Sequence, residues 1–131
     1  MTTSIRPRAG LDRWVPRLTL AAAVVHMAVG AVASAPQWRG IVAGGLWNTV
    51  ADDDHARMTA LWFMMAGVAL LGLGLLARRA VISTGALPAE AGWTLLALGV
   101  PISLLEPVSG GWSLIAIGAL ALAATRRGRS S

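Results

Sequence analysis

Residues 58–77 read MTALWFMMAGVALLGLGLLA, twenty consecutive positions without a charged side chain. A helix rises about 1.5 Å per residue, so this run extends about 30 Å, the thickness of the hydrocarbon core of a bilayer. Three more apolar runs occupy residues 18–35, 87–105 and 108–125. None alternates polar and apolar residues as the strands of a membrane barrel do. The sequence predicts an all-α membrane protein, a four-transmembrane-helix bundle in one domain over residues 1–131.

The composition supports a bilayer as the solvent. Of the 131 residues, 56% are hydrophobic and 13% are charged, against about 25% charged residues in soluble domains. The net charge is +5, but the arginines form short clusters between apolar runs and no basic face, so nucleic-acid binding is not expected. The absence of cysteine excludes disulfides, thiolate metal sites and thiol catalysis. We expect no cofactor.

The arginines predict the orientation of the helices. Nine of them would share one side of the membrane: Arg6, Arg8, Arg13, Arg17, Arg78, Arg79, Arg126, Arg127 and Arg129. Only Arg39 and Arg57 would lie on the other side. By the positive-inside rule, both termini are expected in the cytoplasm, in a multi-pass protein of the bacterial inner membrane.

The segment around residues 33–36 resembles a secretory cleavage site, because Ala33-Ser34-Ala35 follows an arginine-rich start and an apolar run. Pro36 would directly follow the cut, where the peptidase accepts proline poorly. The apolar run is also longer than the core of most signal peptides. We therefore expect an uncleaved first helix.

Residues 37–51 are apolar but too short to span, and Gly44-Gly45 interrupts them. We expect an interfacial or re-entrant segment between the first two helices. Asp52, Asp53 and Asp54 follow, where carboxylates complement the start of a helix. Asp52 and His55 have the spacing of a metal pair, but no third ligand is evident, so no metal site is predicted.

Three residues are candidates for catalysis. Glu106 ends a long apolar run at the outer boundary, so it either finds a partner or takes up a proton and serves as a general acid, or it is a solvated loop residue. His26, in the middle of the first helix, lies on a stripe with Ala22 and Gly30 and either relays protons or bonds to a neighbouring helix. Asp52 is the third candidate, as a proton relay.

Five residues are candidates for ligand binding, all predicted in the outer half of the molecule: Trp47, Asn48, Arg57, Trp62 and Trp112. Indole faces beside Glu106 could stabilise a cationic ligand or intermediate, or the tryptophans could form an ordinary aromatic belt. Arg57 could pair with the aspartates or with Glu106.

Four segments carry a resemblance: GLWNTV (45–50), RMTALWFMMAG (57–67), LPAEAGWTLLAL (87–98) and PVSGGW (107–112). Together they resemble a family of small bacterial four-helix integral membrane proteins catalogued as a domain of unknown function. The resemblance covers nearly the whole chain and implies the same four-helix fold. It implies no activity.

Three functions are compatible with these features. The first is binding, with cyclisation or isomerisation by acid catalysis, of a lipophilic, terpenoid-like molecule in an outward-side pocket, with Glu106 as the acid. The second is a non-catalytic membrane subunit or scaffold, because glycine- and alanine-rich faces suit packing with a partner or in a homo-oligomer. The third is a small proton-coupled exporter, which is disfavoured because the first helix carries His26 and no acid.

Overall fold

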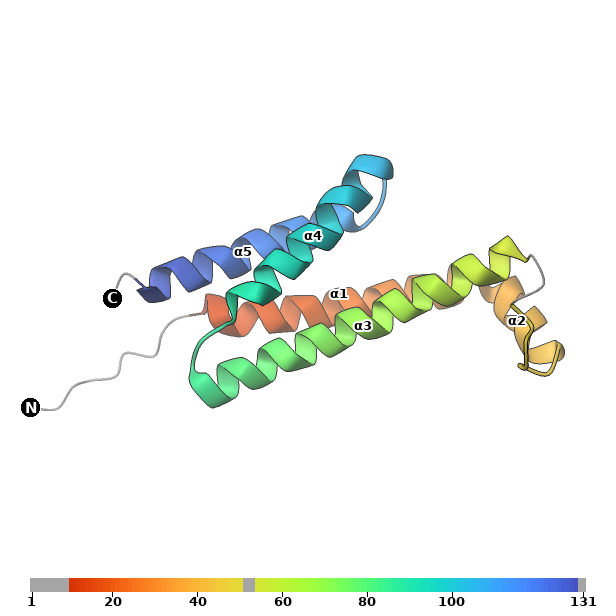
Figure 1. The fold of residues 1–131 in the computed structure, drawn as a ribbon, viewed down its shortest axis with the longest axis horizontal. Helices are drawn as coiled ribbons and strands as arrows, with labels where there is room; N and C mark the ends of the chain where they lie inside the picture. Colours follow the sequence, from red (N-terminus) through yellow and green to blue (C-terminus); the bar gives the residue numbers. More distant parts are fainter. Residues whose placement is uncertain (1–9, 51–53, 130–131) are drawn as a thin grey trace, which may run out of the picture.

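The computed structural model describes residues 10–50 and 54–129, and five helices form this part of the chain (Figure 1). They are α1 (Leu11–Ala33), α2 (Ala35–Ala43), α3 (His55–Thr84), α4 (Ala89–Leu105) and α5 (Gly111–Arg129). Four are long helices and α2 is a short one. The all-helical class predicted from the sequence is confirmed.

The ends of α3 differ most from the prediction of 58–77. The helix begins after Asp54, whose carboxylate accepts a hydrogen bond from the Arg57 backbone N–H at 3.0 Å, as an N-cap does. It ends at Thr84, and the C-cap residue Gly85 has the left-handed φ of 72° that glycine adopts without strain. Arg78 and Arg79 therefore lie inside the helix, which continues seven residues beyond the predicted end at residue 77. The two arginines end the apolar run, but because arginine is a good helix former they do not end the helix.

The other long helices are shifted by a few residues from their predicted bounds. α1 begins seven residues before the predicted 18, because the polar residues there do not break a helix. α4 matches the predicted 87–105 closely: Pro88 is its N-cap and Glu90 lies in its first turn. α5 begins three residues after the predicted 108, since residues 106–110 form the turn before it.

The four long helices form two antiparallel pairs. In the α1–α3 hairpin, glycines allow close approach: a Cβ on Gly74 would lie 3.2 Å from the Leu20 backbone nitrogen. In the α4–α5 hairpin, a Cβ on Gly99 would lie 2.9 Å from the Gly111 carbonyl oxygen. Small residues at such crossings are typical of helix pairs in membranes.

The two hairpins meet through α1 and α5 at one end of the molecule. The shared core contains Val15 and Ala23 of α1, Leu95 of α4, and Ile117 and Ala121 of α5. Toward the other end the hairpins diverge (Figure 1). There α2 runs across the axis of the α1–α3 pair and covers its tip.

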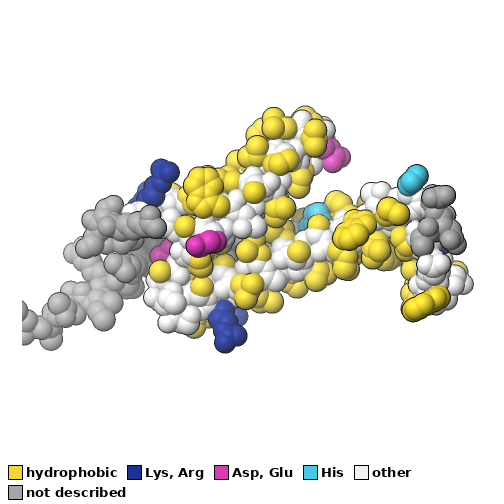
Figure 2. All heavy atoms as spheres, in the orientation of Figure 1, with side chains coloured by type: hydrophobic (Ala, Val, Ile, Leu, Met, Phe, Trp, Pro, Cys, Tyr) yellow, Lys and Arg dark blue, Asp and Glu magenta, His cyan; other side chains and the backbone are white. Residues whose placement is uncertain are grey.

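Apolar side chains lie along both hairpins on the face that Figure 2 shows. Exposed examples occur on every long helix, including Val25, Leu76, Leu104 and Trp112. By length and composition, α1 and α3 could each cross a membrane, and α4 is a shorter apolar helix.

Candidate functional site

One face of α1 changes from buried to exposed along its length. Residues three and four apart share a helix face, and this face consists of Val15, Thr19, Ala22, His26, Val29 and Ala33. Val15 and Thr19 are 1% exposed, whereas Val29 is 52% exposed. The face is therefore covered where the hairpins meet and uncovered where they diverge.

The face of α5 that packs against α1 also changes from buried to exposed, but toward the N-terminal end of the helix. Ala121 and Ile117 are buried, Leu114 is half-buried, and Ser113, one turn before Ile117, is exposed. We call the space between these two uncovered faces the wedge. In Figure 2 the two hairpins separate at this end, and hydrophobic side chains lie on both sides of the separation.

His26 lies on the α1 side of the wedge and is fixed by α3. Its Nε2 lies 2.9 Å from the Phe63 carbonyl oxygen, and its ring stacks on the Phe63 ring with centroids 3.9 Å apart. A contact with a carbonyl requires the Nε2–H tautomer, in which Nδ1 is an acceptor. The bond to a neighbouring helix, one of two predictions for His26, is confirmed. The ring stays half-buried, so its other nitrogen can meet a ligand.

Trp62 lies on the wedge side of α3. Leu73 of the same helix packs against the shared core, and Trp62 precedes it by eleven residues, about three turns, so both lie on one face. Because α3 and α4 diverge (Figure 1), the indole is 67% exposed.

Glu106 and Trp112 lie at the tip of the α4–α5 hairpin. Glu106 is the C-cap residue of α4, and its side chain is exposed. The Trp112 indole N–H donates to the Pro107 carbonyl at 2.9 Å and closes the turn. Trp112 precedes Ile117 by five residues, which places it about 140° around α5 from the wedge face. The structure brings His26 and Trp62 to the wedge, Glu106 to its rim, and Trp112 to the far side of α5.

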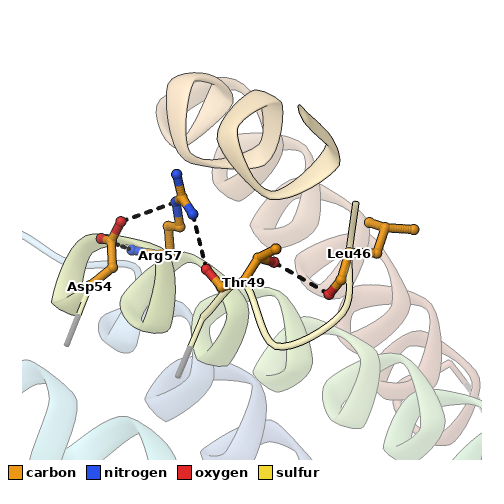
Figure 3. Close-up of polar contacts among 4 residues, drawn as sticks. All are labelled: Leu46, Thr49, Asp54 and Arg57. Carbon is orange, nitrogen blue, oxygen red and sulfur yellow. Dashed lines mark hydrogen bonds and ion pairs between the residues drawn. The ribbon is translucent and has the colours of Figure 1, made fainter. Parts of the chain in front are cut away.

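Arg57 ties together the end of the α1–α3 hairpin, as Figure 3 shows. Its Nε lies 3.0 Å from an Asp54 carboxylate oxygen, and one guanidinium nitrogen donates to the Thr49 carbonyl at 3.0 Å. The same side chain lies against Gly40 of α2, where a Cβ would come within 2.8 Å of it. The predicted pairing of Arg57 with an aspartate is confirmed, and this role is structural.

Trp47 and Asn48 belong to the turn between α2 and α3. Trp47 is 91% exposed, and Asn48 has a φ of 57°, a left-handed conformation that asparagine tolerates well. Neither residue is close in sequence to the wedge face of α1, and neither contacts that face in the described part of the chain. An exposed indole is typical of the headgroup region of a membrane.

Asp52 lies outside the described residues, so its predicted roles are not placed. Within residues 10–50 and 54–129, the structure shows no group of three or more potential metal ligands. His55 is exposed at the first position of α3.

Sequence reasoning missed two residues of this region. Phe63 supplies both the carbonyl and the ring that hold His26, and it is the only phenylalanine of the chain. Thr49 supplies the carbonyl that Arg57 binds. Both residues provide a backbone oxygen, which side-chain identity does not signal, and Phe63 adds its ring.

The chain belongs to a family described as a family of unknown function, DUF6463, which it matches over residues 10–128. The comparison with curated proteins gave no match. The comparison with solved structures gave no match either.

Proposed function

We propose that this DUF6463 protein is a multi-pass protein of the bacterial inner membrane that binds a lipophilic, terpenoid-like small molecule in the wedge. One observation carries the proposal: the facing stripes of α1 and α5 are buried at one end and uncovered at the other. Uncovered and largely apolar faces on two diverging hairpins offer a site that a flat or tapered lipophile can fill.

The charges on α3 support the membrane part of the proposal. Arg57 and Arg78 are separated by 21 residues, about 31 Å along the helix, and no charged residue lies between them. That length equals the hydrocarbon core of a bilayer, so each arginine reaches a headgroup region. In this arrangement α1, α3, α4 and α5 span the membrane with both termini in the cytoplasm, and the wedge opens toward the outer leaflet.

The chemistry of the wedge supports binding more directly than catalysis. His26 offers one ring nitrogen, and Trp62 offers an indole face that can contact a cation or an unsaturated hydrocarbon. Glu106 stands at the rim with an exposed carboxylate. Protonation of a bound alkene by Glu106 requires the ligand to extend to the rim, and this step remains a prediction.

Native mass spectrometry of protein extracted in mild detergent tests the binding. Wild type is expected to retain a small lipophile. Val29→Trp places an indole inside the wedge and is expected to abolish retention. Val24→Trp is the matched control, because Val24 is 56% exposed and lies five residues, about 140°, around α1 from Val29.

Two results would contradict the proposal. One is a spectrum of wild type with bulk phospholipid alone. The other is equal retention of the lipophile by both tryptophan variants. A stoichiometric protein partner in place of a small molecule would support the scaffold function, for which the exposed apolar faces are the favouring observation.

A further inference from the structure

The end of the molecule opposite the wedge carries arginines on three helices. The exposed ones are Arg13 and Arg17 of α1, Arg78 and Arg79 of α3, and Arg126 and Arg127 of α5. Two acids, Asp12 and Glu90, accompany them in the described part of the chain. Figure 2 shows basic side chains at this end. The end is therefore strongly basic, and every basic group is a guanidinium.

The register of α1 against α3 brings three of these arginines to nearly one level. Leu20 contacts Gly74 across the hairpin. Arg17 precedes Leu20 by three residues and Arg78 follows Gly74 by four, so the two lie about 4.5 and 6 Å beyond that contact. Arg13 lies one turn further along α1, next to Arg17. Helix axes at such contacts are about 8–10 Å apart, a span that two arginine side chains can bridge.

The guanidinium groups of this cluster keep their donors available. Within the described residues, Arg13 and Arg78 make no ion pair or hydrogen bond. Arg17 lies over the Trp14 ring, with its guanidinium carbon 5.6 Å from the ring centroid. This cation–π contact orients Arg17 and leaves its N–H groups free to bind an anion.

The surface beside the cluster is apolar. Toward the wedge, the next turns on the same side expose Val24 of α1 and Leu75 of α3. A ligand that fits both parts of this surface carries an anionic head and hydrocarbon chains. Free phosphate and polyanions such as nucleic acids match only the basic part.

We infer that Arg13, Arg17 and Arg78 bind the phosphate headgroup of an anionic phospholipid, whose acyl chains lie along α1 and α3. Guanidinium groups bind phosphate oxygens in pairs of parallel hydrogen bonds, which a lysine cannot reproduce. Trp14, 55% exposed, lies at the level where indole rings meet the headgroup region. The inference rests on the proposed membrane location and is independent of the wedge and its ligand.

Native mass spectrometry with a defined lipid mixture tests this site. The protein in neutral detergent is mixed with equal amounts of phosphatidylglycerol and phosphatidylcholine. Wild type is expected to retain phosphatidylglycerol in preference. Basic residues near a membrane surface each contribute about a fivefold preference for anionic lipid. In the double variant Arg17→Gln/Arg78→Gln, the preference for phosphatidylglycerol over phosphatidylcholine is therefore expected to fall more than tenfold. Arg39→Gln, exposed at the other end of the molecule, is the matched control and keeps the preference.

Equal retention of the two lipids by wild type overturns the inference, and so does an equal loss in the Arg39→Gln control. Displacement of phosphatidylglycerol by millimolar inorganic phosphate would identify a site for free anions and would also overturn it. If the double variant does not fold, the salt dependence of wild type decides: the preference must fall severalfold between 50 and 500 mM salt, and a constant preference refutes the site. Loss of the wedge ligand in Val29→Trp leaves this result unchanged, so the two proposals fail separately.

Discussion

Replacing Gly99 with alanine tests a close approach of the α4 and α5 backbones. The new Cβ would lie 2.9 Å from both the Gly111 carbonyl oxygen and the Ile115 backbone nitrogen. These are backbone atoms, so relief requires α5 to move as a unit and not a side chain to rotate. Overpacking of this kind costs about 1–3 kcal/mol, and removal of a helical glycine returns about 0.5–1 kcal/mol. We expect the free energy of unfolding of the Gly99→Ala variant to fall by about 1–2 kcal/mol.

Gly72→Ala is the matched control for this prediction. Gly72 also lies inside a long apolar helix, but nothing lies within 4 Å of the position that its Cβ would take. The control is expected to be as stable as wild type or more stable by up to about 1 kcal/mol. Unfolding by SDS in mixed micelles, followed by tryptophan fluorescence, measures both variants. Equal stability of the two variants would refute the close α4–α5 packing.

Three further predictions concern the wedge and the end of the α1–α3 hairpin. His26→Ala removes the hydrogen bond and the ring stacking with Phe63, and we expect a loss of about 1–2 kcal/mol in the same unfolding assay; an unchanged midpoint would contradict the contact. Arg57→Gln removes the hydrogen bond to Thr49 and the ion pair with Asp54. Because that ion pair is partly solvated, we expect the free energy of unfolding to fall by less than about 1 kcal/mol, but proteolysis within residues 44–50 to become severalfold faster. An unchanged cleavage rate would contradict the role of Arg57 in holding this segment. Glu106→Gln is expected to abolish any turnover of the wedge ligand without changing stability, and full activity of the variant would exclude Glu106 as the acid.

Much of the fold could be predicted from the sequence because length and apolar content determine it. The runs at residues 58–77 and 87–105 each became one helix. The segment predicted not to span, residues 37–51, contains most of the nine-residue helix α2. The exact helix ends could not be predicted, because Arg78 and Arg79 end an apolar run without ending the helix.

The divergence of the hairpins could not be predicted from the sequence. In lipid, an apolar side chain that faces a neighbouring helix is chemically the same as one that faces acyl chains. Val15 and Val29 are therefore equivalent in sequence, yet one is buried and the other exposed. For the same reason the sequence predicted both Trp62 and Trp112 as ligand-binding residues. Only their positions around their helices distinguish the one on the wedge side from the one on the far side.

The central claim is that the two hairpins meet at one end and form a wedge at the other within a bilayer. The chain has no cysteine, so spin labels can be placed on introduced cysteine pairs without background. Pulsed electron paramagnetic resonance in lipid nanodiscs then compares Val29 with Ser113, across the wedge, and Arg17 with Arg127, at the opposite end. The account predicts that the Val29–Ser113 distance across the wedge is longer than the Arg17–Arg127 distance by roughly one helix diameter, about 10 Å. A narrow, short distance across the wedge, as in a closed bundle with axes about 8–10 Å apart, would contradict it.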